Sequence, residues 1–225
     1  MMHDPATKLV IFDCDGVLVD SEPISVEVMV AEFEKAGVAI DADYVYRHFL
    51  GRSMATVVET AKTEFSLAID EAFLASLRAH LFDRFRRDLQ PIAGLTDALD
   101  DLSRSGIAWC VASSSQPDRI ALSLDVTGLI DRFRPHIFSA TMVKNGKPAP
   151  DLFLYAADKM TVPPSACVVV EDSPAGLKAA RAAGMRALAF TGGGHAVGDI
   201  YHRSIDELAP DAKFDVMADL VQFIP

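Results

Sequence analysis

The 225-residue sequence has few cysteines, little positive charge and no long hydrophobic run. Its three cysteines, Cys14, Cys110 and Cys167, each lie within or beside an apolar run, which favours buried free thiols over a disulfide framework. No apolar stretch approaches the roughly 20 residues that a membrane-spanning helix needs. Residues 1–8 resemble neither a signal peptide nor a transit peptide. These absences predict a soluble, cytoplasmic protein that does not bind membranes.

Positive charge is scarce, because 21 Lys and Arg residues are set against 32 Asp and Glu residues and leave a net charge of −11. A protein that binds nucleic acid through its phosphates needs a basic face. The densest basic patch contains Arg84, Arg86 and Arg87, and aspartates flank it on both sides. We therefore expect no nucleic-acid partner. The hydrophobic content of 50% and the charged content of 24% are those of an ordinary globular chain.

Short apolar runs recur along the chain without the alternation that is typical of half-exposed strands. Continuous runs of this kind indicate strands buried on both faces, as in a parallel sheet with helices on each side. Helix signals lie between the runs, such as Ser173 as an N-cap before Pro174. The sequence therefore predicts an α/β protein with a doubly wound, Rossmann-like parallel sheet. The runs are residues 9–12, 107–112, 137–138, 167–170 and 187–190.

Residues 21–89 interrupt this alternation, because no comparable strand run occurs there. Apolar residues recur at helical spacing instead, for example at Phe73, Leu77 and Leu81. This pattern predicts a small all-helical domain inserted after the first strand. Residues 1–20 and 90–225 would then form the α/β core.

Polar residues follow the predicted strands at their carboxyl ends, where parallel sheets bind ligands. Asp13 and Asp15 leave the first strand two residues apart, so both carboxylates face the same side. One carboxylate could attack a substrate while the other donates or accepts a proton. The second strand is followed by Ser113, Ser114 and Ser115, whose hydroxyl and amide groups suit an anion.

Two further strand-end groups carry charge. Lys147 lies in a loop that would hold its ammonium near the same edge, and another strand ends in Glu171 and Asp172. Together with Asp13, these acidic residues make an oxygen-rich site of the type that Mg²⁺ prefers. Such a site binds phosphate only if the metal and Lys147 offset the carboxylates.

The order of these four groups resembles the haloacid dehalogenase-like (HAD) superfamily of hydrolases over essentially the whole chain. Residues 147–151 and 171–176 are similar to the forms found in its β-phosphoglucomutase-like and sugar-phosphatase branch. The helical insert at 21–89 is similar to the cap domain of that branch. The segments that match the four motifs are Asp13-Cys14-Asp15-Gly16-Val17-Leu18-Val19-Asp20-Ser21-Glu22, Ser113, Lys147 and Glu171-Asp172.

The resemblance implies a two-step transfer of a phosphoryl group from a small-molecule phosphomonoester. Asp13 would be the nucleophile and form an aspartyl-phosphate. Asp15 would protonate the leaving alcohol and then deprotonate the attacking water. Mg²⁺ would be the cofactor, held by the Asp13 carboxylate, the Asp15 carbonyl and Asp172, with Glu171 as a supporting or direct ligand.

The resemblance also implies roles in substrate binding. Lys147 would bridge Asp13 and the phosphate, and Ser113 with the amide of Ser114 would bind a phosphoryl oxygen. Substrate choice would lie in the cap and its hinge. The candidate specificity residues are Glu22, Arg52 and Ser53. We expect a sugar phosphate or a sugar-acid phosphate as substrate, and a monomer or a weak homodimer.

Two alternatives stay open beside the phosphatase. A β-phosphoglucomutase-like mutase would have a histidine five residues after the position of Asp20, where this chain has Ser25. A non-catalytic phosphometabolite-binding module would be expected to lose Asp13, Asp15 or Lys147, and all three are present. The second aspartate also argues against a dehalogenase.

A glycine run at residues 192–194 raises the possibility of nucleotide binding. It lacks both the Gly-x-Gly-x-x-Gly spacing and the Gly-Lys-Ser/Thr ending of nucleotide-binding motifs. We therefore interpret it as a flexible loop at a strand end.

Overall fold

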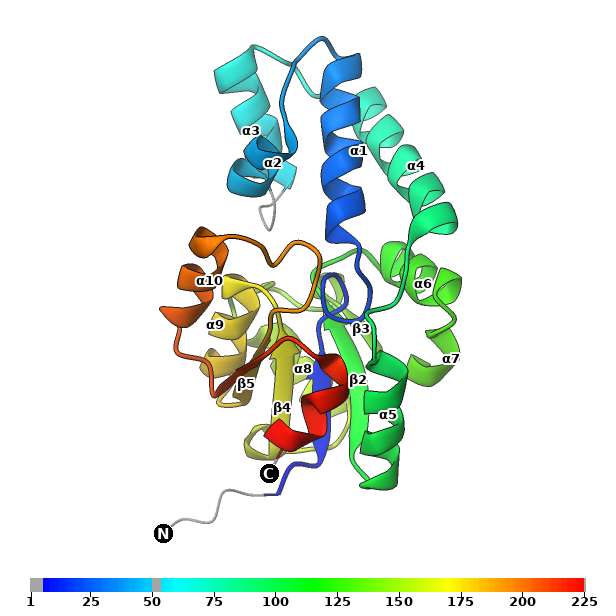
Figure 1. The fold of residues 1–225 in the computed structure, drawn as a ribbon, viewed down its shortest axis with the longest axis vertical. Helices are drawn as coiled ribbons and strands as arrows, with labels where there is room; N and C mark the ends of the chain where they lie inside the picture. Colours follow the sequence, from blue (N-terminus) through cyan, green and yellow to red (C-terminus); the bar gives the residue numbers. More distant parts are fainter. Residues whose placement is uncertain (1–5, 50–53, 225) are drawn as a thin grey trace. The chain divides into compact units, whose positions relative to one another are not determined.

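The computed structural model describes residues 6–49 and 54–224 (Figure 1). The chain divides into two compact units, one formed by residues 1–20 and 90–225 and the other by residues 21–89. We call them the larger unit and the helical unit.

The larger unit contains a parallel six-stranded sheet in the order β3-β2-β1-β4-β5-β6, as the expected α/β fold requires. Phe12, the last residue of β1, pairs with Val111 of β2 and Val170 of β4, so these central strands reach the same edge together. The predicted runs all form strands, whereas β6 was not predicted. The strands are β1 (Leu9–Phe12), β2 (Ala108–Ser113), β3 (Ile137–Ser139), β4 (Cys167–Glu171), β5 (Arg186–Phe190) and β6 (Ala212–Phe214).

Helices cover both faces of this sheet (Figure 1). Leu9 and Ile11 lie in one core cluster with apolar residues of α8 and α9, and Phe12 packs edge-on against Phe133 of α7. The helices are α5 (Leu95–Arg104), α6 (Pro117–Val126), α7 (Ile130–Phe133), α8 (Asp151–Lys159), α9 (Pro174–Ala182) and α10 (Asp199–Asp206). Short 3-10 turns are η1 (Ala140–Met142), η2 (Pro164–Ala166) and η3 (Met217–Phe223).

The helical unit has its own small core. Phe33 is fully buried, and its ring packs against those of Phe49, Phe65 and Phe73. The described helices of this unit are α1 (Glu22–Lys35), α2 (Ala42–His48), α3 (Met54–Phe65) and α4 (Glu71–Asp88).

One carboxylate is buried in the helical unit. Glu32 of α1 is 3% exposed, and its Oε1 lies 2.5 Å from Lys35 Nζ and 2.9 Å from His80 Nδ1. Ser76 Oγ donates to Oε2 at 2.7 Å. Burial raises the pKa of Glu32, but the hydrogen bonds from Lys35, Ser76 and His80 outweigh it and leave the pKa below its ordinary value. The cluster therefore ties α1 to α4.

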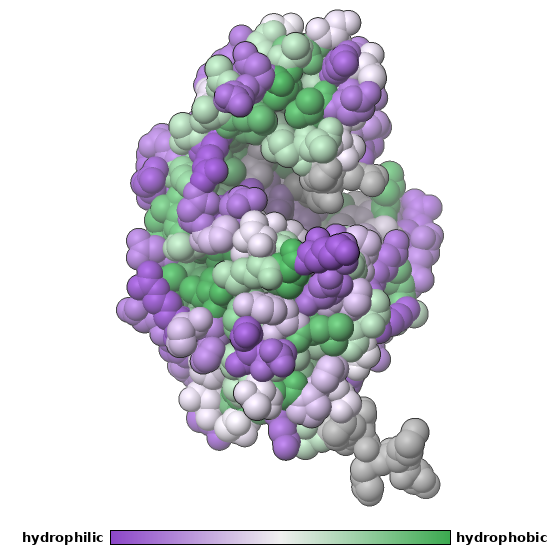
Figure 2. Space-filling view, turned by 180° about the vertical axis from the view of Figure 1, so that it is seen from behind, coloured by the Kyte–Doolittle hydropathy of each residue, from purple (hydrophilic) through white to green (hydrophobic). Residues whose placement is uncertain are grey.

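The surface is mixed in polarity. On the face shown in Figure 2, hydrophilic residues surround smaller hydrophobic areas. Within residues 6–49 and 54–224, no helix is both long and apolar enough to span a membrane. Cys14, Cys110 and Cys167 are buried free thiols, as the sequence indicated.

Candidate active site

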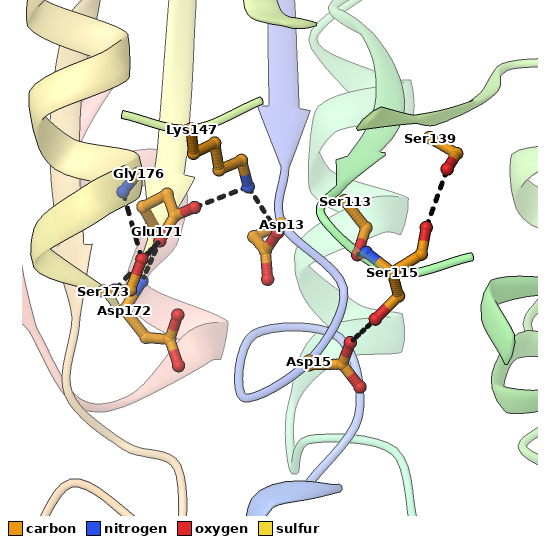
Figure 3. Close-up of polar contacts among 10 residues, drawn as sticks. All are labelled: Asp13, Asp15, Ser113, Ser115, Ser139, Lys147, Glu171, Asp172, Ser173 and Gly176. Atoms are coloured by element: carbon orange, nitrogen blue, oxygen red, sulfur yellow. Dashed lines mark hydrogen bonds and ion pairs between the residues drawn. The ribbon is translucent and has the colours of Figure 1, made fainter. Parts of the chain in front are cut away.

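Asp13 lies at the centre of the polar groups that gather at the carboxyl edge of the sheet (Figure 3). It directly follows β1, and its backbone N–H donates to Val170 O of β4 at 3.0 Å. This bond continues the pairing of β1 with β4 by one residue and so fixes the backbone position of Asp13. Asp13 is 8% exposed, so its carboxylate is largely withdrawn from water.

Lys147 joins two strand ends. It comes from the loop between η1 and α8, and its Nζ lies 2.5 Å from Asp13 Oδ1 and 2.6 Å from Glu171 Oε1. The same ammonium sits over the ring of Phe153, 4.8 Å from its centroid. Burial lowers the pKa of Lys147, but Asp13 and Glu171 outweigh it and raise the pKa above its ordinary value. The lysine is therefore held as a buried cation.

Glu171 is fully occupied by donors. Its Oε1 accepts from Lys147, and its Oε2 accepts from the backbone N–H of Asp172 and of Ser173 and from the Ser173 hydroxyl, at 2.9–3.0 Å. Ser173 also caps α9, as predicted, by accepting from Gly176 N–H. A Cβ on Gly176 would lie 1.8 Å from Glu171 Oε1. Position 176 in the first turn of α9 therefore requires glycine, because a Cβ there would overlap the Glu171 carboxylate.

Asp172 is held by two residues that follow β5 in the chain, His195 and Tyr201. Its Oδ2 lies 2.9 Å from His195 Nε2, and its backbone oxygen accepts from the Tyr201 hydroxyl at 2.8 Å. Burial raises the pKa of Asp172, whereas His195 lowers it. Burial also raises the pKa of Asp13, and although Lys147 lowers it, Glu171, Asp172 and Asp15 raise it further. The edge therefore concentrates more negative charge than Lys147 offsets.

Asp15 is held by residues that follow β2, on the side of the site away from Asp172. Figure 3 shows its contact with Ser115. Ser115 Oγ donates to Asp15 Oδ2 at 2.6 Å, and Arg119 of α6 contacts Oδ1 at 2.8 Å. Ser115 is itself fixed, because its carbonyl accepts from Ser139 Oγ and its N–H donates to Ser113 Oγ. Residues from the ends of β2 and β3 and from α6 thus set the position of Asp15.

The sequence profile of the haloacid dehalogenase-like hydrolases matches residues 7–184. This match contains Asp13, Asp15, Lys147 and Glu171 in the arrangement just described. The chain belongs to the haloacid dehalogenase-like hydrolase family. It is therefore an enzyme of the hydrolase type.

Several known proteins resemble the chain over most of its length. The 6-phosphogluconate phosphatase of Escherichia coli (strain K12) is 28% identical over 189 residues, 84% of each chain. A conserved haloacid dehalogenase-like protein of unknown function from Agrobacterium tumefaciens is 35% identical, with 96% of each chain covered and a TM-score of 0.83. A HAD family hydrolase from Deinococcus radiodurans, solved with bound phosphate and sodium, is 29% identical over 96% of this chain and 94% of that chain, with a TM-score of 0.79.

The donor set of this HAD-like site fits Mg²⁺. In the described part of the chain no three His, Cys, Asp or Glu side chains form a ready metal cage. Mg²⁺ does not need one, since it takes one or two carboxylates and keeps several waters. Lys147 occupies one oxygen of Asp13 and His195 one oxygen of Asp172, which leaves one oxygen of each for a cation. Burial, with a further contribution from the neighbouring carboxylates, raises the pKa of both Asp13 and Asp172, and a divalent ion would offset this buried negative charge.

The remaining candidates are more scattered. Ser113 is buried at the end of β2, and Ser114 is exposed beside it. Glu22 is the first residue of α1 in the helical unit. Arg52 and Ser53 lie outside the described residues.

Sequence reasoning missed four residues that contact the predicted groups: Ser115 as a partner of Asp15, Arg119, His195 and Tyr201. His195 follows β5, where the rule that ligands bind at strand ends would have found it. Arg119 carried no local signal, because its contact with Asp15 spans 104 residues.

Proposed function

We propose that this chain is a Mg²⁺-dependent phosphatase that hydrolyses small phosphorylated metabolites through a phosphorylated Asp13. The observation that carries the proposal is the contact of Lys147 Nζ with Asp13 Oδ1 at 2.5 Å, inside a buried, acidic strand edge. The contact orients the carboxylate of Asp13 for attack on phosphorus. When bound, Mg²⁺ supplies the positive charge that lets a carboxylate and a phosphate dianion approach each other.

In the first step, Asp13 attacks phosphorus and the substrate alcohol leaves. Asp15 gives the leaving oxygen its proton. In the second step, Asp15 takes a proton from water, which attacks the phosphorus of the aspartyl-phosphate and releases inorganic phosphate. Ser115 and Arg119 contact both oxygens of Asp15 in this structure. Asp15 therefore exchanges one of these partners for the substrate oxygen or for water when it transfers a proton.

The phosphoryl group would lie between Lys147 and the end of β2. Lys147 offsets its charge, as it already does for Asp13 and Glu171. Ser113 Oγ accepts from Ser115 N–H, so its own proton can be donated to a phosphoryl oxygen. The exposed amide of Ser114 supplies a second donor. Glu171 acts here as a positioning residue for Lys147 rather than as a metal ligand, because donors occupy both its oxygens.

The helical unit is proposed to be a cap that selects the substrate through Glu22, Arg52 and Ser53. The Escherichia coli relative is a 6-phosphogluconate phosphatase, and 6-phosphogluconate is a phosphorylated sugar acid. This supports a sugar phosphate or a sugar-acid phosphate as the substrate of this chain. Ser25 supports hydrolysis over mutase chemistry. Its hydroxyl donates to Ser21 O within α1 at 2.9 Å and stands where the mutases have a histidine.

The test is phosphate release from hexose phosphates, pentose phosphates, phosphogluconate, nucleotides and p-nitrophenyl phosphate, with and without Mg²⁺. We expect Mg²⁺-dependent release by the wild type, and its loss in Asp13→Asn, which keeps the side-chain shape. Asp131→Asn, on α7 in the same unit, is the matched control and should retain activity. Conversion of a sugar 1-phosphate to its 6-phosphate without release would instead indicate a mutase. Silence in both assays would indicate a binding module.

A further inference from the structure

Residues 192–194 are three glycines in the loop that follows β5, and the next residue, His195, contacts Asp172. His195 is 5% exposed, and its Nε2 lies 2.9 Å from Asp172 Oδ2. The ring also packs edge-on against Tyr201 of α10, at 5.5 Å between centroids. A polar ring buried against a carboxylate in this way restricts that carboxylate to one orientation.

Two glycines make room for the contact. A Cβ on Gly16, in the loop after β1, would lie 2.1 Å from Asp172 Oδ2 and 2.7 Å from His195 Cε1. A Cβ on Gly193 would lie 2.9 Å from both Gly16 O and the His195 ring. Glycines in two separate loops therefore leave space for one histidine–carboxylate pair. This close approach, rather than flexibility, explains Gly193.

The loop is anchored at two further points. Gly194 N–H donates to Asp20 Oδ1 at 2.9 Å, which ties it to the end of the first segment of the larger unit. The Tyr201 hydroxyl donates to Asp172 O at 2.8 Å, so α10 also fixes the aspartate through its backbone. Both contacts hold the elements that bring His195 and Asp172 together.

We infer that His195 is a positioning residue for Asp172, and that it directs the second oxygen of this carboxylate toward the cation of the active site. The inference rests on the proposed function, in which Asp172 is a cation ligand. Carboxylate ligands are commonly oriented by hydrogen bonds from outside the metal, and loss of such a partner weakens metal binding roughly 10- to 100-fold.

The experiment measures Mn²⁺ binding to the full-length protein by electron paramagnetic resonance, with Mn²⁺ as a paramagnetic substitute for Mg²⁺. His195→Leu removes the donor at similar volume, and His195→Gln keeps an N–H near the position of Nε2. We expect roughly 10- to 100-fold weaker binding in His195→Leu and near-normal binding in His195→Gln. His136→Leu, just before β3, is the matched control and should bind Mn²⁺ normally.

If His195→Leu fails to fold, His195→Asn takes its place. The amide of Asn reaches the position of Nδ1 and not that of Nε2, so the same loss of Mn²⁺ affinity is expected. Wild-type Mn²⁺ affinity in a folded His195→Leu, or in His195→Asn where that protein does not fold, would overturn the inference. Equal weakening in His195→Leu and His195→Gln would also overturn it. If the wild type neither binds Mn²⁺ nor releases phosphate, the proposed function itself fails. If the wild type does both and the His195 variant binds Mn²⁺ equally well, only the role of His195 is refuted.

Discussion

Among residues 6–49 and 54–224, each unit buries one glutamate, and the two glutamates differ in what surrounds them. Glu32 in the helical unit is contacted by donors, namely Lys35, Ser76 and His80. Glu171 in the larger unit shares its cation, Lys147, with a second carboxylate, that of Asp13. Burial and hydrogen bonds are therefore common to both sites and do not by themselves indicate catalysis.

The difference lies in the balance of charge. The pKa of Glu32 is lowered, because its donors outweigh its burial. The pKa of Asp13 is raised, because burial and three acidic neighbours outweigh Lys147. A site that satisfies its charge stabilises the fold, whereas a site that leaves charge unsatisfied is ready to bind a cation and to react.

The largest expected effect is that of Glu171→Gln. The three donors at Oε2 would take the amide oxygen, so the new NH₂ group would face the Lys147 ammonium. Loss of one partner of a buried ion pair costs about 3–5 kcal/mol. We also expect phosphate release to fall by roughly two to three orders of magnitude, because Lys147 is no longer directed at Asp13. Urea unfolding and steady-state kinetics measure both, and near-normal activity would refute the role given to Glu171.

Gly176→Ala is expected to destabilise the larger unit by about 1–3 kcal/mol through overpacking. Helix propensity alone would predict a gain of about 1 kcal/mol at this position in α9. The sign is reversed because the new Cβ would overlap Glu171 Oε1. Thermal unfolding tests this sign, and in a Glu171→Ala background the same substitution should cost nothing further. Stabilisation of the otherwise wild-type protein would contradict the packing.

Glu32→Gln makes the same chemical change in the helical unit, with a smaller expected effect. One amide oxygen can still accept from Lys35 and His80, and the Ser76 hydroxyl can reverse to accept from the NH₂ group. We expect a loss of about 1 kcal/mol in urea unfolding. Turnover of p-nitrophenyl phosphate should stay near that of the wild type. A loss as large as that of Glu171→Gln would erase the distinction between the two sites.

The smallest expected effect is the change in the free energy of unfolding at acidic pH. Because the pKa of Glu32 is lower in the folded chain, its ionised form stabilises the fold at pH values above its ordinary pKa of 4.5. This stabilisation is lost as pH falls through the lowered pKa. The difference in unfolding free energy between wild type and Glu32→Gln should therefore be constant near neutral pH and shrink below pH 4.5. A difference that grows in acid would show that the sign is wrong.

The sequence predicted those parts of the molecule that depend on local pattern. Leu9 to Phe12 form a continuous apolar run because both faces of β1 are covered, and Asp13 follows at the edge where the strands end. The N-cap at Ser173 was also predictable, because Ser-Pro at a helix start is a local signal. Strand β6 was missed, since three residues with one exposed lysine resemble a loop.

Contacts between distant elements were less predictable. Glu171 was expected to support or bind the metal. The three donors at its Oε2, which the sequence does not reveal, are the basis of our proposal that it positions Lys147. His195 followed a strand, but the glycines before it resembled a flexible loop. A close approach between loops that are far apart in sequence has no local pattern to reveal it.

The most direct test of the account is to trap the phosphorylated enzyme. Wild-type protein with Mg²⁺ and a radiolabelled sugar phosphate would be quenched in acid during turnover, digested and analysed by mass spectrometry. The account predicts an acid-stable, alkali-labile phosphate on Asp13 that is absent from Asp13→Asn. Phosphate on another residue, or continued turnover by Asp13→Asn, would contradict it.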